Sequence, residues 1–195
     1  MSEPRGRAPS VYPVREDTLL LAPFARAGPG RRVAEVGCGT GLAARWAAAS
    51  GARVVATDRN RTALLRLAAV ARAERLAIDC VRTDFLAGLG RFDRILANPP
   101  YLPTPAGAGD PDPGDRWALD GGPDGLRATE RILAQLPEHL APGAEAFVLF
   151  SSLQDAAHRG ALRVDWRGRG GRWEDVAHRS LAGEELSVVR LTLAP

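Results

Sequence analysis

Asn98, Pro99, Pro100 and Tyr101, directly after the apolar segment 92–97, are the residues of this chain with the clearest chemistry. Each proline fixes its own φ and biases the preceding residue towards extended backbone, so Asn98 and Tyr101 are held on a rigid turn. The Asn98 amide oxygen and the Pro99 carbonyl can accept hydrogen bonds, and Tyr101 offers a flat aromatic face. Such a set suits a planar –NH2 group, whose two hydrogens go to the acceptors while the ring stacks on its plane. The alternative is a proline-braced turn with a surface tyrosine.

A glycine-rich turn is the second chemical feature. Residues 32–36 predict a short strand, residues 37–41 (Gly-Cys-Gly-Thr-Gly) a turn, and residues 42–50 a helix. A strand, a glycine turn and a helix form the first unit of a doubly wound parallel sheet. Glycines allow the backbone to touch a ligand, and the helix N-terminus offers free N–H groups.

The spacing of these glycines departs from the dinucleotide-binding motif, because Leu42 stands where that motif requires its third glycine. With the acidic Glu35 before the turn, the pattern predicts a nucleoside that carries a cationic tail rather than a pyrophosphate. Glu35, Gly37 and Gly39 are therefore expected to border the ligand.

Two further predicted strands lead to carboxylates. Asp58 ends the strand 53–58 and lies 21 residues after Gly37, the interval at which an acidic residue accepts ribose hydroxyls. Alternatively Asp58 caps the next helix, although Asn60 could do this instead. The strand 76–81 leads to Asp84, which could accept from the exocyclic amine of an adenine or serve as a turn residue. Phe85 beside it would offer backbone and apolar contact.

The remaining pattern predicts a helix start at 15–18, where Thr18 could act as a helix-start hydroxyl. The elements expected after the Asn-Pro-Pro-Tyr turn are a loop at 106–113, a helix at 124–139, a strand at 144–150, a helix at 151–162, a Gly/Arg loop at 163–172 and an antiparallel pair at 174–180 and 186–193. The Arg-rich segment 159–179 would be a solvated face or help to dock a partner.

Composition sets the broad class. The chain has 195 residues, 45% hydrophobic and 25% charged, which predicts one globular domain over 1–195 with residues 1–10 as a flexible tail. Two cysteines and three scattered histidines provide neither a disulfide framework nor a metal-ligand spacing. No signal-like or membrane-spanning stretch is present, so we expect a cytoplasmic protein. The net charge of +3 allows only weak attraction to RNA.

These motifs resemble class I S-adenosylmethionine-dependent methyltransferases, and within them the HemK family of protein glutamine N5-methyltransferases in its short archaeal and eukaryotic-like form. The matching segments are Val11–Pro13, Glu16–Thr18, Glu35–Gly41, Thr57–Asp58, Thr83–Asp84, Asn98–Tyr101, Asp120–Leu126 and Glu184–Val188.

The resemblance implies a Rossmann-like α/β fold: a seven-stranded, mostly parallel sheet with an antiparallel last strand and helices on both faces. It implies S-adenosylmethionine as cofactor, with the acceptor side handled by Asn98, Pro99 and Tyr101. The implied cofactor contacts are Thr18, Glu35, Gly37, Gly39, Asp58, Asp84, Phe85 and Asn98. The implied acceptor is the glutamine of a Gly-Gly-Gln tripeptide in a class I release factor, and the implied partner is a small zinc-binding activator protein.

Two other functions use the same residues. Asn-Pro-Pro-Tyr is shared with enzymes that methylate exocyclic amino groups in DNA or RNA. The absence of a target-recognition domain, the modest charge and the 6% aromatic content argue against that reading. A non-catalytic cofactor-binding subunit could lose Asn98 or Asp58 freely, yet both are present.

Overall fold

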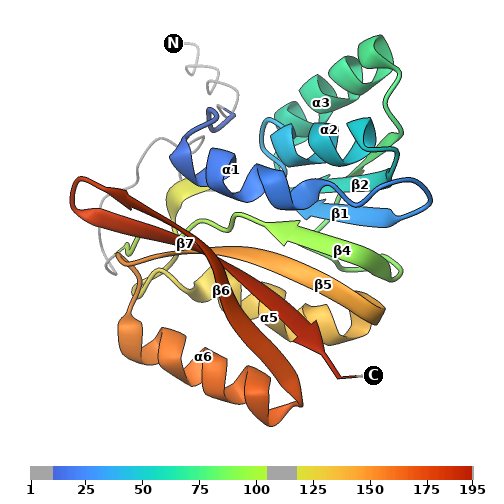
Figure 1. The fold of residues 1–195 in the computed structure, drawn as a ribbon. Helices are drawn as coiled ribbons and strands as arrows, with labels where there is room; N and C mark the ends of the chain where they lie inside the picture. The colour runs from blue at the N-terminus through green and yellow to red at the C-terminus, as the bar shows by residue number, and fades with distance from the viewer. Residues whose placement is uncertain (1–10, 105–117, 195) are drawn as a thin grey trace, which may run out of the picture.

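A single seven-stranded sheet organises the computed structural model, which describes residues 11–104 and 118–194 (Figure 1). The strand order is β3-β2-β1-β4-β5-β7-β6. The strands are β1 (Arg32–Val36), β2 (Arg53–Asp58), β3 (Ile78–Arg82), β4 (Phe92–Ala97), β5 (Leu140–Ser151), β6 (Gly171–Leu181) and β7 (Glu184–Leu193). The first five run parallel, and β7 runs antiparallel to both β5 and β6. This sheet confirms the predicted Rossmann-like class.

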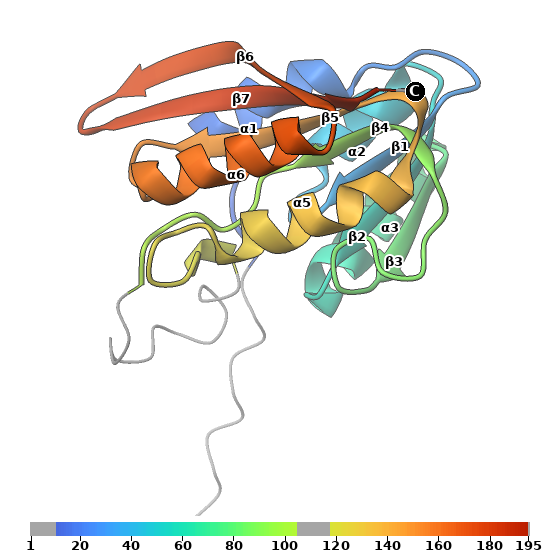
Figure 2. The ribbon, with the colours of Figure 1, turned by 90° about the horizontal axis from the view of Figure 1, so that it is seen from below.

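Helices cover both faces of the sheet, as Figures 1 and 2 show. One face carries α1 (Glu16–Leu21), the 3-10 helix η1 (Ala22–Ala25), α2 (Leu42–Ala49) and α3 (Arg61–Glu74), and the other carries α5 (Arg127–His139) and α6 (Ala156–Gly168). Each layer has its own buried hydrophobic cluster against the sheet.

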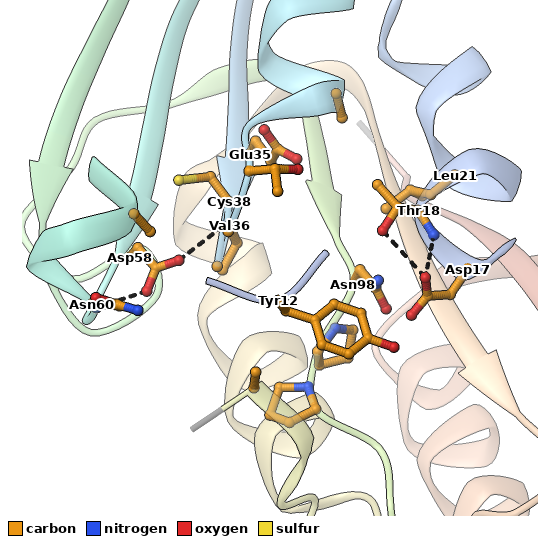
Figure 3. A pocket seen from close by; sticks show the side chains of 18 of the residues that line it. Tyr12, Asp17, Thr18, Leu21, Glu35, Val36, Cys38, Asp58, Asn60 and Asn98 are labelled. Atoms are coloured by element: carbon orange, nitrogen blue, oxygen red, sulfur yellow. Dashed lines mark hydrogen bonds between the residues drawn. The ribbon is translucent and has the colours of Figure 1, made fainter. Parts of the chain in front are cut away.

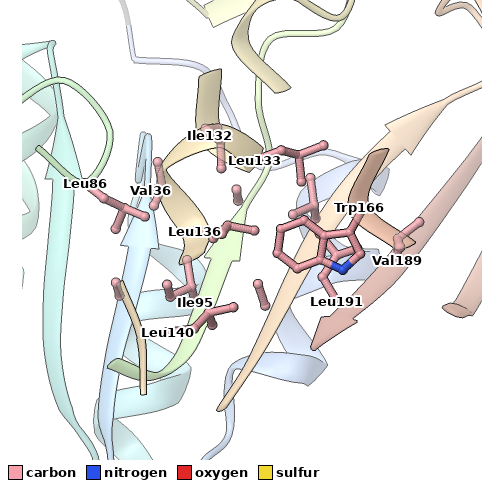
Figure 4. Packing of buried hydrophobic residues seen from close by; sticks show 14 of the residues in the cluster. Val36, Leu86, Ile95, Ile132, Leu133, Leu136, Leu140, Trp166, Val189 and Leu191 are labelled. Carbon is pink, nitrogen blue, oxygen red and sulfur yellow. The ribbon is translucent and has the colours of Figure 1, made fainter. Parts of the chain in front are cut away.

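Strand β4 lies between the two clusters. Ile95 packs in the cluster with Ile132 and Leu136 of α5, whereas the next residue, Leu96, packs in the cluster with α2 (Figure 4). Successive side chains of a strand point to opposite faces, so a strand buried on both sides needs consecutive apolar residues. Ile95 and Leu96 are 1% and 0% exposed, and this double burial fixes the end of β4 from which Asn98 emerges.

The C-terminal third corrects one prediction. The segment 163–172 is not a Gly/Arg loop: α6 begins at Ala156, not at 151, and continues to Gly168, and β6 starts at Gly171. Asp155 caps the helix by accepting from the His158 N–H at 2.7 Å. Trp166 is buried under the helix, and its indole N–H donates to the Arg172 carbonyl at 3.1 Å. Two features favour a helix here over the predicted loop. Arginine is a good helix former, and burial of Trp166 stabilises the last turns of the helix despite the nearby glycines.

Helix α5 also begins later than predicted. It starts at Arg127 rather than at Asp124, whose carboxylate instead accepts from the Leu126 N–H at 2.9 Å in the turn before the helix. The predicted helix start at 15–18 and the closing antiparallel pair are confirmed. The predicted tail 1–10 and loop 106–113 lie outside the described residues. Within residues 11–104 and 118–194, no helix has the length and apolar character that crossing a membrane requires.

Candidate active site

A cavity opens at the carboxyl ends of β1, β2 and β4, beneath α1 and the segment that leads to it (Figure 3). Open α/β sheets bind their ligands at this edge. The cavity brings together all but one of the residues that the sequence predicted as site residues: Thr18, Glu35, Gly37, Gly39, Asp58, Phe85, Asn98, Pro99 and Tyr101. Asp84 is not among the lining residues.

The glycine turn has left-handed backbone at Gly37, Gly39 and Gly41, with φ of 65°, 51° and 74°. At Gly41 a Cβ atom would overlap the Leu67 side chain, so this glycine allows α2 and α3 to pack. At Gly37 and Gly39 a Cβ would meet no atom within 4 Å. Their backbone therefore faces open space, and an absent side chain there leaves room for a ligand.

Asp58 joins the glycine turn to the cavity. Its carboxylate accepts from the Gly39 N–H at 2.9 Å and from the Asn60 N–H at 2.7 Å. The cap of α3 is Asn60, which accepts from the Thr62 N–H at 2.9 Å, so Asp58 does not serve as the helix cap. A carboxylate has about four acceptor positions, and Asp58 keeps capacity for hydroxyl donors.

Glu35 is a buried acid at the floor of the cavity. Its carboxylate accepts from the Ala44 N–H at 2.7 Å and so holds the start of α2 against β1. Burial raises the pKa of Glu35 to about 8, assisted by the charge of Asp58 and opposed by the N–H groups of Ala44 and Ala43. A cation bound beside Glu35 would favour its ionised form.

Asn98 follows β4 directly, and its side chain lines the cavity together with Pro99 and Pro100 (Figure 3). The Asn98 amide oxygen is buried and has no hydrogen-bond partner among the described residues. Buried polar atoms in folded proteins nearly always have a partner, so an acceptor left open in a cavity is suited to a ligand donor.

The backbone of Tyr101 packs against a glycine-rich segment. Gly125 has a φ of 77°, and a Cβ there would overlap the Tyr101 carbonyl oxygen, so only glycine fits. The Gly125 carbonyl accepts from the Gln154 side chain at 2.9 Å. The Leu102 N–H donates to the Leu119 carbonyl at 3.0 Å. The segment 119–125 therefore holds the arm 101–104 in place.

The side chains of Asp84 and Phe85 have different surroundings in the structure. Asp84 forms an ion pair with Arg131 of α5, and its other carboxylate oxygen is buried without a hydrogen-bond partner. Phe85 lines the cavity with a left-handed φ of 57°, unusual for a residue with a side chain. The Arg131 guanidinium lies over its ring, 5.1 Å from the centroid. The pair thus presents the ring, not the carboxylate, to the cavity.

An adjoining cavity continues the site past Phe85. It shares Gly37, Asp58, Phe85 and Pro100 with the first cavity. Its remaining lining residues come from the ends of β2 and β3 and the residues just after them, the segment before α5, and the start of α5: Thr57, Arg59, Thr83, Asp120, Arg127, Ala128 and Arg131. The two cavities therefore adjoin, and Arg59, Arg127 and Arg131 line the second one.

Sequence reasoning did not single out Tyr12 and Asp17 as site residues, although both stood in matching motif segments. Both line the cavity, and Asp17 is 3% exposed (Figure 3). Burial raises the pKa of the Tyr12 hydroxyl, and the nearby charge of Asp17 raises it further. The sequence signal that could have pointed to Asp17 is its place in the first turn of a short helix that precedes the glycine turn.

Comparisons with known proteins agree with this geometry. Residues 16–106 match the family model described as the methyltransferase small domain. A protein of Methanocaldococcus jannaschii, provisionally named protein N5-glutamine methyltransferase, is 35% identical over 74% of this chain and 74% of its own length. Methyltransferase HEMK2 of Mus musculus is 32% identical over 71% of this chain and 70% of its own length. The chain belongs to the HemK family of methyltransferases.

Other members of the HemK family are longer. The release factor glutamine methyltransferase of Moorella thermoacetica is 38% identical over 80% of this chain, which spans only 60% of that relative. Among solved structures, the E. cuniculi Mtq2–Trm112 complex, described as responsible for methylating the eRF1 termination factor, has a TM-score of 0.70 at 21% identity. That similarity covers 94% of this chain and 98% of the matched chain, and it supports the fold.

Proposed function

We propose that this chain methylates the side-chain amide nitrogen of glutamine within a Gly-Gly-Gln sequence of a class I release factor, with S-adenosylmethionine as methyl donor. The observation that carries the proposal is the open Asn98 amide oxygen, buried in the same cavity as the glycine turn and Tyr101. The names of the relatives from M. jannaschii and M. thermoacetica support glutamine as the acceptor.

The residues around the glycine turn fit the proposed cofactor. Gly37 and Gly39 leave open space along their backbone, and Asp58 has capacity for ribose hydroxyls. Glu35 would supply negative charge near the cationic amino acid tail, and Thr18 lines the same cavity. S-adenosylmethionine supplies an electrophilic methyl group on a sulfonium sulfur.

The adenine is proposed to lie against Phe85, whose ring lines the cavity. Asp84 pairs with Arg131 and does not line the cavity, so its proposed contribution is to hold that guanidinium over the Phe85 ring. This differs from a direct contact between Asp84 and the adenine amine, which would require Asp84 to leave Arg131.

The acceptor amide would be positioned by three groups. Asn98 Oδ1 and the Pro99 carbonyl accept its two hydrogens, and the Tyr101 ring covers its plane. An amide nitrogen is a weak nucleophile because its lone pair is delocalised, so orientation and charge stabilisation must supply most of the catalysis. The nitrogen gains the methyl carbon and loses one proton to water. These residues need not deprotonate the amide first.

A small activator protein is the proposed partner of the enzyme. The support comes from the Mtq2–Trm112 complex, a two-protein assembly whose methyltransferase has the same fold. We further propose that residues 1–195 act as one catalytic domain in the cytoplasm, the compartment that a release-factor substrate implies.

The test uses methyl-labelled S-adenosylmethionine with a release factor and a Gly-Gly-Gln peptide, with Asn98→Ala as the inactive control. Label in the peptide at the glutamine, absent with the variant, is the expected result. If label incorporated in a host lysate is removed by nuclease and not by protease, the methyl acceptor is a nucleic acid. A silent wild-type enzyme would be retested with small zinc-binding activator proteins, and continued silence would overturn the proposal.

A further inference from the structure

Gln154 is a polar residue in the turn between β5 and α6, and only 5% of it is exposed. Its side-chain amide makes two hydrogen bonds. The oxygen accepts from the Ser151 N–H at 3.0 Å, at the end of β5, and the nitrogen donates to the Gly125 carbonyl at 2.9 Å. A reversed amide would set donor against donor and acceptor against acceptor, so these partners fix its orientation. The side chain therefore joins the end of the sheet to the segment 119–125.

Other contacts tie the residue before Gly125 to the same turn. The Asp155 N–H donates to the Asp124 carbonyl at 2.9 Å, and the His158 ring nitrogen Nδ1 lies 2.7 Å from the Asp124 carboxylate. Two successive carbonyls, those of residues 124 and 125, thus accept from the turn between β5 and α6. Gln154 is the member of this set that holds Gly125 itself.

Gly125 in turn packs against Tyr101. A Cβ atom on Gly125 would overlap the Tyr101 carbonyl oxygen and would lie 3.2 Å from Gln154 Cγ. Gly125 therefore lies close to both residues, and a displacement of its backbone would change the space available to the Tyr101 carbonyl. The Tyr101 carbonyl belongs to the arm that carries the ring into the cavity.

Removal of the Gln154 amide would leave the Gly125 carbonyl without its buried donor. An unpaired buried carbonyl is unfavourable, so the segment would shift to find another donor or water. Asn98 would not follow this shift, because β4 fixes it from both faces of the sheet. The Tyr101 ring would then lose its alignment with the Asn98 amide, and small misalignments of a reacting group cost much rate.

We propose that Gln154 is a positioning residue that keeps the Tyr101 ring aligned with the Asn98 amide oxygen for the methyl acceptor. The inference rests on the proposed function for the identity of that acceptor. Gln154 lines neither the first cavity nor the adjoining one, so it acts through Gly125 and not by contact with acceptor or cofactor.

The kinetic test compares Gln154→Ala with His139→Ala. His139 is also a buried polar residue, and its ring Nδ1 lies 3.1 Å from one glycine carbonyl, that of Gly90. It stands directly before β5, at the amino end of the parallel strands and so at the edge of the sheet opposite the cavity. Both variants remove a buried hydrogen bond, and both should lower the urea midpoint of unfolding.

Only Gln154→Ala should impair catalysis. Its kcat on the Gly-Gly-Gln peptide should fall about tenfold, less than the roughly hundredfold cost of a 1 Å misplacement. His139→Ala should keep the wild-type kcat, and the affinity of both variants for S-adenosylmethionine should stay within about twofold of wild type. Equal kcat values in the two variants would overturn the inference, because Gln154 would then contribute to folding alone.

Gln154→Glu keeps the size of the side chain and so tests the donor itself. An ionised carboxylate still accepts from the Ser151 N–H but cannot donate to the Gly125 carbonyl, whereas a protonated carboxyl group does both. The ratio of its kcat to that of wild type should therefore rise as pH falls from about 8 to about 5, with burial favouring the neutral form. Taking the ratio at each pH removes the titration of groups that both proteins share, Asp124 and His158 included. A flat ratio would contradict the proposed role.

A spectroscopic test is independent of any substrate. The chain has two tyrosines, so ring-labelled ¹³C-tyrosine gives two sets of resonances, and Tyr12→Phe assigns them. Gln154→Ala should shift the Tyr101 resonances, whereas His139→Ala should not. Unshifted Tyr101 resonances in Gln154→Ala would overturn the inference. A wild-type enzyme that labels no peptide would instead refute the proposed function, and the kinetic comparison would then use the nucleic acid that takes the label.

Discussion

The two ends of the cavity are built in different ways. The glycine-turn end comes from one short stretch: Glu35 bonds the Ala44 N–H nine residues later, and Gly39 bonds Asp58 over 19 residues. The acceptor end takes Tyr101 from one segment and holds it against Gly125 of a second, whose carbonyl accepts from Gln154 of a third. The first end is a local supersecondary unit, whereas the second exists only once the whole sheet has formed.

Substitutions at the two ends of the cavity should have different effects on the enzyme. Changes at the acceptor end should reduce methyl transfer and spare cofactor affinity, while changes at the glycine-turn end should act in the reverse sense. The four predictions below test this separation, beginning with the largest expected effect.

Asn98→Ala should lower kcat by roughly 10²-fold or more, the scale for losing one aligned polar group. It removes the open acceptor oxygen and leaves the backbone of the turn in place. Radiolabel transfer gives the rate and equilibrium dialysis gives the cofactor affinity, which should be nearly unchanged. A variant that transfers methyl groups at the wild-type rate would remove the chemical basis of the acceptor end.

Gly125→Ala should lower kcat by about tenfold to a hundredfold, because the new Cβ would displace the Tyr101 carbonyl and move the arm that carries the ring. Gly143→Ala is the matched control: its φ of 73° is equally left-handed, but a Cβ there meets no atom within 4 Å. Gly143→Ala should lose about 1–2 kcal/mol of unfolding free energy from backbone strain, and Gly125→Ala should lose more because its Cβ also overlaps the Tyr101 carbonyl. Equal kcat values for the two variants would contradict the bracing role of Gly125.

Asp58→Ala should raise the dissociation constant for S-adenosylmethionine about tenfold or more, the scale of a lost hydrogen bond to a charged group. It removes the carboxylate that holds the Gly39 N–H and faces the cavity. Isothermal titration measures the constant, and Asp79→Ala on the exposed side of β3 serves as control. Unchanged affinity for S-adenosylmethionine with a reduced kcat would contradict the placement of Asp58 at the cofactor end of the cavity.

Glu35→Gln should change the pH dependence of stability. The pKa of Glu35 rises from an ordinary value of 4.5 to about 8 in the folded chain, so between these pH values the folded state binds more protons than the unfolded state. The free energy of unfolding contributed by this group therefore falls as pH rises through that window, and the glutamine variant should lose that slope. Urea unfolding of the ligand-free protein at pH 5, 6, 7 and 8 measures it. Identical slopes would show that Glu35 ionises normally.

The difference between local and long-range contacts also explains which site residues could be predicted from the sequence. Strand, turn and helix periods around Gly37 are local, so the position of Asp58 at a strand end could be predicted from spacing. Asn98 followed from the prolines beside it. The structure decided between Asp58 and Asn60 as the cap of α3 by a hydrogen bond that no pattern encodes.

The contacts that hold the site residues in place were hidden from the sequence. The close approach of Gly125 to the Tyr101 carbonyl and the ion pair between Asp84 and Arg131 join residues that lie far apart in the chain. The helical stretch through Trp166 was also missed, because burial of one indole outweighed the glycines around it.

The double burial of β4 has a further consequence for how such a protein can change over time. Ile95 and Leu96 face opposite hydrophobic clusters, so few substitutions on this strand would be tolerated. The position of Asn98, which directly follows the strand, is therefore also fixed. The segment 119–125, which braces Tyr101, lies outside the strand and contributes no side chain to either buried cluster. A lineage could therefore exchange one methyl acceptor for another by reshaping the rim, while the strand beneath it kept the same nitrogen chemistry.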